Sequence, residues 1–427
     1  MARPALVSPV VGRTARSTLS ALSALSAVSA VSAVAVVPAL SAVAVVSAVA
    51  VVPATVAFAT TSVARAAGAG TAVGQLAPTG TGDLEAVSCA TASTCWAVGA
   101  MPVGRQNPSA GGATVVLART GDGGVRWSDV RVHTAAPVEL SAVSCPDRRH
   151  CTAVGATSID GLPVGAVLAT ADGGRRWVAR GRPSGSVDVV GVACSSATAC
   201  VALATDGTTY WAASTTDGGL SWQRQGSLPA GFGGVGDLVC PAAGRCLVAG
   251  YIAVSPAKGA GAVAVSDDGG ATWRLAAVPP GTGLLHAAAC PGPGHCLTAG
   301  TTSSTDTDLA PAPGAVLAST DGGSSFATGP RPAGVDDGFD LACPARARCV
   351  LVGTGWTSGA DAVPSGAVAV SDDGGLRWRA VATRYLPVGL IGVACPSATV
   401  CVAAGNDVVA RIALPPSTSQ GGRHQTR

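Results

Sequence analysis

The sequence predicts an all-β fold, a seven-bladed β-propeller built from four-stranded antiparallel blades with one disulfide in each blade. Its fourteen cysteines form seven pairs, and five residues separate the partners in every pair. Successive first cysteines are 56, 49, 46, 50, 53 and 52 residues apart. A period near 50 residues is typical of propellers and solenoids. A short segment containing Asp-x-Gly also recurs six times with this period.

The N-terminal segment, residues 1–66, predicts export. Residues 17–64 carry no charged side chain and consist largely of Ser, Ala and Val, and Arg3, Arg13 and Arg16 precede them. A positive leader, an apolar run and then small residues are the order of a signal peptide. The run exceeds the roughly 7 to 15 apolar residues of an ordinary signal core, so a membrane-anchoring segment and a start codon assigned too far upstream remain alternatives.

The charge balance excludes two classes of partner. Residues 1–66 contain four arginines and no acidic residue, so the remaining chain has 27 − 4 = 23 basic against 24 acidic side chains. A nearly neutral surface gives no electrostatic basis for binding nucleic acid or anionic lipid. Contact with a membrane is therefore expected only if residues 1–66 are uncleaved. The export segment itself predicts an extracellular or cell-surface location.

The paired cysteines predict disulfides, because an even set with uniform spacing behind an export signal is typical of proteins folded outside the cytoplasm. Zinc is the alternative, since His150 and His295 each lie beside a cysteine, but only two of the seven units contain such a histidine. We predict no metal site. The predicted pairs are Cys89 with Cys95, Cys145 with Cys151, Cys194 with Cys200, Cys240 with Cys246, Cys290 with Cys296, Cys343 with Cys349, and Cys395 with Cys401.

Each repeat reads as four short strands, here called A to D. In the second repeat these are "LSAVSC", "CTAVGA", "GAVLAT" and "RRWVAR", with the cysteine loop between A and B and "ADGG" between C and D. Small and β-branched residues between Gly and Asp turns predict strands. The A–B and C–D connections must leave one face of the ring, and the B–C and D–A connections the other.

The last repeat predicts how the ring closes. The segment "LIGVACPSATVCVAAGNDVVARIAL", residues 390–414, supplies strands A, B and C and then stops without a C–D turn. Residues around 71–78 can supply the missing outer strand, which would also protect the sheet edges. We therefore predict a propeller over 71–414, followed by a polar, disordered tail over 415–427.

The recurring turn follows the pattern Ser/Thr-x-Asp-x-Gly-x-x-Trp/Phe, as in "SDDGGATW". It resembles the Asp-box, or bacterial neuraminidase repeat, of sialidases, sortilin-type receptors, xyloglucanases and photosystem II assembly-factor-like propellers. That resemblance implies a structural role in shaping the hairpin: the carboxylate accepts backbone hydrogen bonds, glycines supply positive φ, and the aromatic residue packs. The paired positions are Asp122 and Trp127, Asp172 and Trp177, Asp217 and Trp222, Asp268 and Trp273, Asp321 and Phe326, and Asp373 and Trp378.

Adjacent carboxylates, as at Asp267 and Asp372, raise calcium binding as an alternative, but their spacing is not that of a calcium loop. Resemblance to sialidases would imply an arginine triad, a tyrosine nucleophile and acidic partners. A residue-by-residue match fails, because the chain has only two glutamates, Glu85 and Glu139, and no Arg-Ile-Pro motif before the repeats. We predict no catalytic residues and no cofactor. The closer resemblance to photosystem II assembly-factor-like propellers implies a non-catalytic scaffold that holds other proteins.

Recognition is expected on the B–C and D–A face, because its loops vary in length whereas the cysteine loops do not. The candidate binding residues are Trp356, Tyr251, Arg105, Arg331 and Tyr385, whereas Trp96 and Trp211 are expected in the core. The sequence thus predicts an exported monomeric propeller that binds a protein or other ligand. The alternative is a secreted glycan-binding or sialidase-like glycoside hydrolase, which would use this same face.

Overall fold

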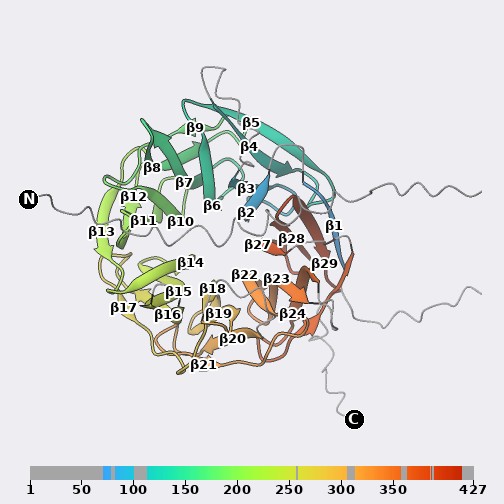
Figure 1. Ribbon diagram of the computed structural model, residues 1–427. Helices are drawn as coiled ribbons and strands as arrows, with labels where there is room; N and C mark the ends of the chain where they lie inside the picture. Colours follow the sequence, from blue (N-terminus) through green and yellow to red (C-terminus); the bar gives the residue numbers. More distant parts are fainter. Residues whose placement is uncertain are drawn as a thin grey trace, which may run out of the picture.

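The computed structural model describes residues 71–77, 82–100, 113–255, 258–304, 313–356, 363–384, 386 and 389–415. These ranges contain 29 strands and no helix. The strands form seven sheets arranged around a ring (Figure 1), which confirms the predicted all-β propeller. Accordingly, no helix that could cross a membrane occurs in the described ranges. The predicted signal or anchor segment, 1–66, lies outside them, as do residues 416–427 of the predicted tail.

Six blades each consist of four consecutive antiparallel strands, with the first strand innermost. Blades 1 and 2 comprise β2 (Asp83–Cys89), β3 (Cys95–Ala100), β4 (Ala113–Thr120), β5 (Trp127–Thr134), β6 (Val138–Ser144), β7 (Cys151–Ile159), β8 (Leu162–Thr170) and β9 (Val178–Ala179). Blades 3 and 4 comprise β10 (Asp188–Cys194), β11 (Cys200–Thr205), β12 (Tyr210–Thr215), β13 (Gln223–Ser227), β14 (Phe232–Ala242), β15 (Arg245–Ser255), β16 (Lys258–Ser266) and β17 (Arg274–Leu275). Blades 5 and 6 comprise β18 (Leu285–Gly292), β19 (His295–Thr301), β20 (Gly314–Ser319), β21 (Ala327–Thr328), β22 (Asp337–Ala345), β23 (Arg348–Trp356), β24 (Pro364–Ser371) and β25 (Arg379–Ala380).

Blade 7 combines both ends of the propeller. It contains β27 (Leu390–Ser397), β28 (Val400–Gly405) and β29 (Val408–Ala413), and its fourth strand is β1 (Thr71–Leu76). β1 pairs antiparallel with β29 over six residues, which confirms the predicted closure by an N-terminal strand. The sequence did not predict β26 (Ala382–Arg384), which adds a fifth strand parallel to β1. This outermost strand covers an edge that β1 would otherwise expose.

All seven predicted disulfides are present, one in each blade. Each joins the end of an innermost strand to the start of the next strand, where the Cα atoms are 3.9–4.1 Å apart. The second cysteine of every pair is at most 5% exposed. The sulfur of each second cysteine therefore serves both as a covalent link and as a small apolar core group.

The hydrophobic core is divided into seven clusters, each lying between two successive blades. The cluster between blades 1 and 2, for example, joins Trp96 and Leu117 to Leu140 and Cys151. Ala, Val and Leu dominate all seven clusters, and each contains the buried second cysteine of the following blade. Trp96 and Trp211 are 1% and 0% exposed, which confirms their predicted core positions.

Every innermost strand has a β-bulge at the same position, four residues before its first cysteine. The unpaired residues are Glu85, Ser141, Val190, Gly236, His286, Phe339 and Ile391. A bulge bends its strand and increases the local twist. The backbone geometry of the repeat is therefore conserved around the ring, although seven different residue types occupy this position.

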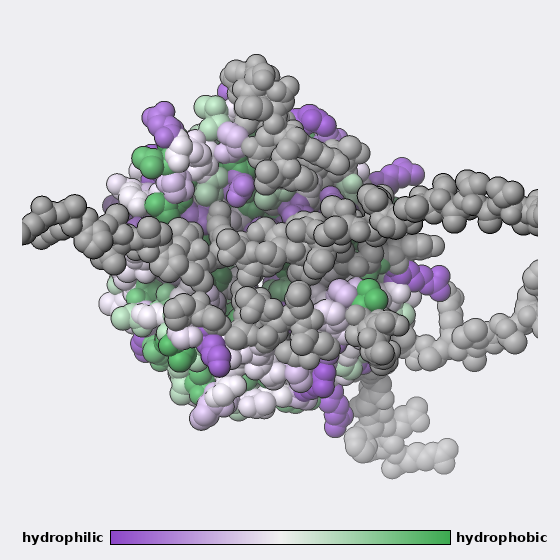
Figure 2. All heavy atoms as spheres, in the orientation of Figure 1, coloured by the Kyte–Doolittle hydropathy of each residue, from purple (hydrophilic) through white to green (hydrophobic). Residues whose placement is uncertain are grey.

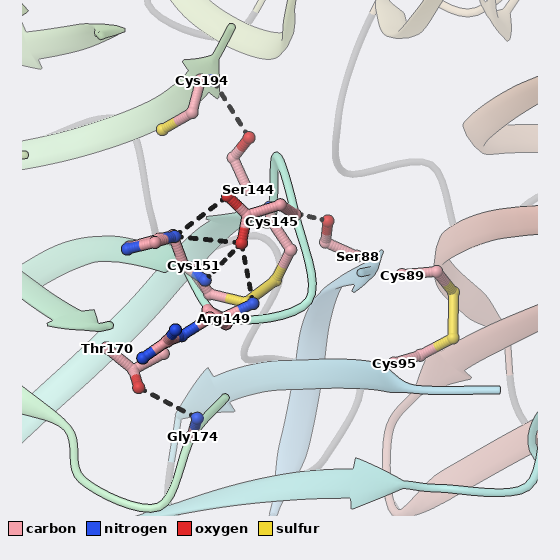
Figure 3. The surroundings of a disulfide bond; sticks show 12 residues. Ser88, Cys89, Cys95, Ser144, Cys145, Arg149, Cys151, Thr170, Gly174 and Cys194 are labelled. Atoms are coloured by element: carbon pink, nitrogen blue, oxygen red, sulfur yellow. Dashed lines mark hydrogen bonds and ion pairs between the residues drawn. A yellow bond between two sulfur atoms is a disulfide. The ribbon is translucent and has the colours of Figure 1, made fainter. Parts of the chain in front are cut away.

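Hydrogen bonds also connect the innermost strands of neighbouring blades. The Ser88 hydroxyl accepts from the Cys145 N–H at 3.1 Å, and the Ser144 hydroxyl accepts from the Cys194 N–H at 3.0 Å (Figure 3). Between blades 6 and 7 the acceptor is instead a carboxylate at a different position: Asp340, three residues before Cys343, accepts from the Val393 N–H at 2.6 Å. These bonds fix the stagger between blades close to the disulfides.

Candidate functional site

The cysteine loops and the Asp-x-Gly turns lie on one face of the ring, here called the cysteine face. We call the turns, residues 120–127, 170–177, 215–222, 266–273, 319–326 and 371–378, the Asp turns. In all six, the first glycine donates its N–H to the carbonyl of the residue two positions before the second cysteine, at 2.6–3.0 Å. The disulfide loop and the turn of one blade therefore support each other. The opposite face, which carries the B–C and D–A connections, is called the loop face.

The six aspartates of the Asp turns are bonded within their own turns. The first Ser or Thr donates its hydroxyl to the aspartate at 2.7–2.9 Å, and this hydroxyl accepts from the second glycine N–H at 2.7–3.0 Å. The aspartate also accepts the backbone N–H four residues later, at 2.8–3.0 Å. The carboxylates therefore hold hairpins and are not grouped around one point.

Hydrogen bonds to these carboxylates favour their ionised form. The backbone N–H of Arg126 lowers the pKa of Asp122, and the Ser221 hydroxyl lowers the pKa of Asp217. The Thr272 hydroxyl and backbone N–H lower the pKa of Asp268 to about 2. An aspartate with such a pKa is ionised at neutral pH and is poorly suited to act as a general acid.

The second glycine of the Asp turn lets the preceding blade approach. At Gly174, where φ is +82°, an added Cβ would lie 1.9 Å from the Trp96 ring of blade 1. At Gly375, where φ is +91°, it would lie 2.9 Å from the Leu297 side chain of blade 5. Both the positive φ and the close contact require glycine at these positions.

The adjacent carboxylates that suggested calcium are engaged by arginines. Asp267 pairs with Arg245 at 2.5 Å and with Arg274 at 3.3 Å. Asp372 pairs in the same way with Arg348 at 2.7 Å and with Arg379 at 3.1 Å. Within the described ranges, no group of three or more His, Cys, Asp or Glu side chains could hold a metal ion.

Two of the predicted binding residues come together on the loop face. The Arg331 guanidinium donates to Asp336 at 2.8 Å, and the backbone N–H of Trp356 donates to the other oxygen of Asp336 at 2.9 Å. Trp356 is the last residue of β23, and its side chain is half-buried. Asp336 thus holds the Arg331 side chain and the Trp356 backbone together at the loop-face end of blade 6.

Of the other predicted binding residues, only Tyr251 lies in the described ranges, and it belongs to blade 4. Tyr251 lies in the middle of β15, and its ring covers Gly234 and Gly259, where an added Cβ would approach it to 2.4–2.5 Å. Glycines therefore make room for this aromatic ring within blade 4. Arg105 and Tyr385 lie outside the described residues.

The structure also contains a groove that the sequence did not predict. This rim groove, about 590 Å³ in volume, lies on the outer side of the ring between β5 of blade 1 and β8 and β9 of blade 2. β9 pairs with only two residues of β8, so most of β8 has no fourth strand beside it. Side chains of β5 line the groove on the other side.

Arginines dominate the polar lining of the rim groove. Five line it, and none of the described lining residues is Asp or Glu: Arg131, Arg175, Arg176, Arg180 and Arg182. Its apolar lining comes from Val130, Val132, Val138, Ile159, Val167, Leu168 and Trp177. The one local signal in the sequence was the density of arginine in "GGRRWVARGRP". On the face shown in Figure 2, most hydrophilic side chains of the described surface lie around the perimeter of the ring.

Comparisons with known proteins agree with the fold. No protein-family profile and no curated protein matches the sequence. Among solved structures, YCF48 bound to a D1 peptide is similar, with a TM-score of 0.54 and 16% identity over 81% of this chain and 97% of that one. A GH74 enzyme from Niastella koreensis has a TM-score of 0.52 and 13% identity over 79% of this chain and 53% of that one.

Virginiamycin B lyase from Staphylococcus aureus is similar at a TM-score of 0.52, with 8% identity over 81% of this chain and 99% of that one. At these identities the likeness establishes the fold alone, and propellers carry many unrelated functions. The class that fold and covalent structure define is a seven-bladed β-propeller with one disulfide in each blade.

Proposed function

We propose that this chain is an exported, non-catalytic β-propeller that serves as a binding scaffold for a protein or other ligand. In this proposal residues 1–66 direct export or anchor the chain, residues 71–414 form the binding unit, and residues 415–427 are a disordered tail. The seven disulfides support export, because such bonds form and persist in oxidising compartments. The hydrogen-bond pattern of the six Asp turns supports their assignment to the Asp-box class.

One observation carries the proposal: the two faces of the ring differ in what their polar groups do. On the cysteine face the repeated carboxylates and glycines bond to their own blades. On the loop face, Asp336 holds the Arg331 side chain and the Trp356 backbone, a combination found once among the described residues. A rigid scaffold that presents non-repeated arginine and aromatic residues is typical of a recognition surface.

The solved neighbours include both functional possibilities. YCF48 is described with a bound D1 peptide, and the GH74 protein is described as an enzyme. Glycoside hydrolysis requires two positioned carboxyl groups, one of which acts as the acid. The carboxylates of the Asp turns do not suit that role, because turn hydrogen bonds lower the pKa of Asp217, Asp268 and Asp321.

The test compares binding with hydrolysis on the purified chain. A displayed peptide library and a glycan array would be probed with the wild-type protein and with the double variant Arg331→Ala, Trp356→Ala. We expect selected peptides to lose affinity for the double variant, and we expect no release of sugar from a panel of glycoside substrates. Hydrolysis that survives purification to homogeneity would contradict the non-catalytic proposal.

A further inference from the structure

We infer that the rim groove is a second binding site, which takes an extended acidic segment of a partner protein. The inference rests on the proposed binding function, but its location differs, because the groove lies between blades 1 and 2 whereas Arg331 and Trp356 belong to blade 6. The rim groove would therefore bind an acidic segment at a surface separate from Arg331 and Trp356 on the loop face.

The charge of the rim groove selects an anionic ligand. Nearby carboxylates neutralise only part of the charge from its five arginines: Asp129 pairs with Arg131 at 3.1 Å, and Asp172 is bonded within its own turn by Thr170 and the Arg176 N–H. In the part of the chain that the structure describes, the exposed guanidiniums of Arg176 and Arg182 have no carboxylate partner. Guanidinium groups bind carboxylates with paired hydrogen bonds.

The apolar lining selects a peptide over an anionic polysaccharide. The apolar wall open to a ligand is formed by Ile159, which is 46% exposed, and by the half-buried Val130 and Val178. Val132, Leu168 and Trp177 lie beneath it, at most 7% exposed, in the core cluster between blades 1 and 2. An extended peptide places alternate side chains on opposite sides, so acidic residues can face the arginines while apolar residues contact this wall. A uronic-acid polymer would offer carboxylates but no apolar side chains.

The hairpin beside the groove adds exposed apolar surface. Ile159, which lines the groove, is 46% exposed, and Leu162 across the turn is 67% exposed. The two residues between them, Asp160 and Gly161, have φ values of 51° and 78°, as in the tight turns that hold a hairpin rigidly. A rigid hairpin that presents two large apolar side chains next to a cationic groove fits a protein partner.

The experiment uses fluorescence anisotropy with the full propeller and a labelled peptide of alternating Asp and Val, about ten residues long, which exceeds the length of β5. The test variant is Arg176→Glu with Arg182→Glu. Its matched control is Arg377→Glu, because Arg377 occupies the same position in the Asp turn of blade 6 and is also exposed. A second variant, Ile159→Ser, tests the apolar contact. The competitor ligands are polygalacturonate and a peptide with Asn in place of Asp.

We expect the double variant to weaken peptide binding by roughly tenfold or more at low salt, and Arg377→Glu to change it less than about twofold. Ile159→Ser should weaken the peptide but leave any binding of polygalacturonate unchanged. Three results would each overturn the inference: equal losses in the double variant and in Arg377→Glu, equal affinity for the Asp and Asn peptides, or tighter binding of polygalacturonate than of the peptide. Loss of the groove site would leave the Arg331 and Trp356 result standing, so the two proposals fail separately.

Discussion

Blade 7 and the six other blades reach the same architecture by different means. Blades 1–6 pass through an Asp turn into a fourth strand that is local in sequence, and in blades 2, 4, 5 and 6 that strand has only two residues. Blade 7 takes a six-residue fourth strand, β1, from the other end of the propeller. Where a turn is present, a short strand is sufficient. Where the turn is lacking, a longer ladder of backbone hydrogen bonds completes the blade.

The hydrogen bonds between neighbouring blades also differ where blade 7 lacks an Asp turn. The residue before the second cysteine reaches the next blade in three cases: Arg245 donates to the Gly322 carbonyl, and His295 donates to the Gly374 carbonyl at 2.8 Å, both within Asp turns. Arg348 instead donates to the Ala398 carbonyl at 2.7 Å, in the cysteine loop of blade 7. The donor side chain keeps its position in the repeat, and the acceptor changes because blade 7 provides a different loop.

The largest effect is expected from breaking the closure of blade 7. Ala72→Pro would remove a donor from β1, whose register with β29 and β26 includes Ala72, a fully buried residue. Proline inside a strand with partners on both sides is strongly unfavourable. We expect a loss of the cooperative thermal transition, or a large decrease in Tm, measured by circular dichroism. Ala327→Pro, in the two-residue β21, should cause a much smaller decrease, and equal effects would show that closure is not special.

A smaller effect is expected at the contact between blades 6 and 7. The Arg348 side chain is 2% exposed and joins Asp372 to the Ala398 carbonyl. Hydrogen bonds from a charged group contribute about 1.5–3 kcal/mol, so Arg348→Ala should decrease the free energy of unfolding by that order in urea denaturation, while Asp372 keeps its pair with Arg379. The equivalent Arg245, whose side chain is 31% exposed, should matter less. A larger loss for Arg245→Ala would contradict the importance of this contact for blade 7.

The disulfides provide the third comparison. Each closes a loop of about seven residues, for which the chain-entropy relation gives about 2 kcal/mol. We expect replacement of Cys290 and Cys296 by serine to cost this order, because the Asp turn of blade 5 still bonds to the cysteine loop. Replacement of Cys395 and Cys401 should cost more, since in blade 7 the corresponding carbonyl, that of Thr399, accepts from the Leu414 N–H, which no Asp turn holds in place. Chemical denaturation of both variants measures the difference.

The smallest effect is expected from acid. Turn hydrogen bonds lower the pKa of Asp268 to about 2, and they also lower the pKa of Asp122, Asp172, Asp217 and Asp321. A carboxyl with a lower pKa in the folded state stabilises the fold above its unfolded pKa, and this contribution is lost as pH falls through the folded pKa. Thermal stability should therefore decrease between about pH 4 and pH 2. Asp268→Asn should reduce that decrease slightly, whereas an unchanged pH profile would show that the turn contributes nothing to it.

The sequence predicted most of the fold because its main signals are local and repeated. The cysteine spacing defined the blades, and the missing turn after Val408–Ala413 pointed to closure by residues near Thr71. It did not predict β26, whose three residues carry no strand signal of their own and depend on β1 as a template. Nor did it predict the bulges, because Glu85, His286 and Ile391 share no side-chain chemistry.

The candidate sites were less predictable, because they depend on contacts between distant residues. Trp356 and Arg331 were singled out separately, and only the structure shows that Asp336 holds both. The rim groove joins β5 to residues that follow it by about 30 to 50 positions, and its volume depends on the short β9. A cluster of arginines in sequence is visible, but the apolar wall beside them is not.

The pairing of β1 with β29 also places both ends of the propeller on the same face. Thr71 is paired with Ala413, and Ala413 is in turn paired with Val400, next to the last disulfide. The polypeptide therefore both enters and leaves the propeller at the cysteine face of a single blade. A tether joined to either chain end of the propeller would start at this face. A surface that held the protein by such a tether would therefore lie nearer to the disulfides, and the loop face would point away from it.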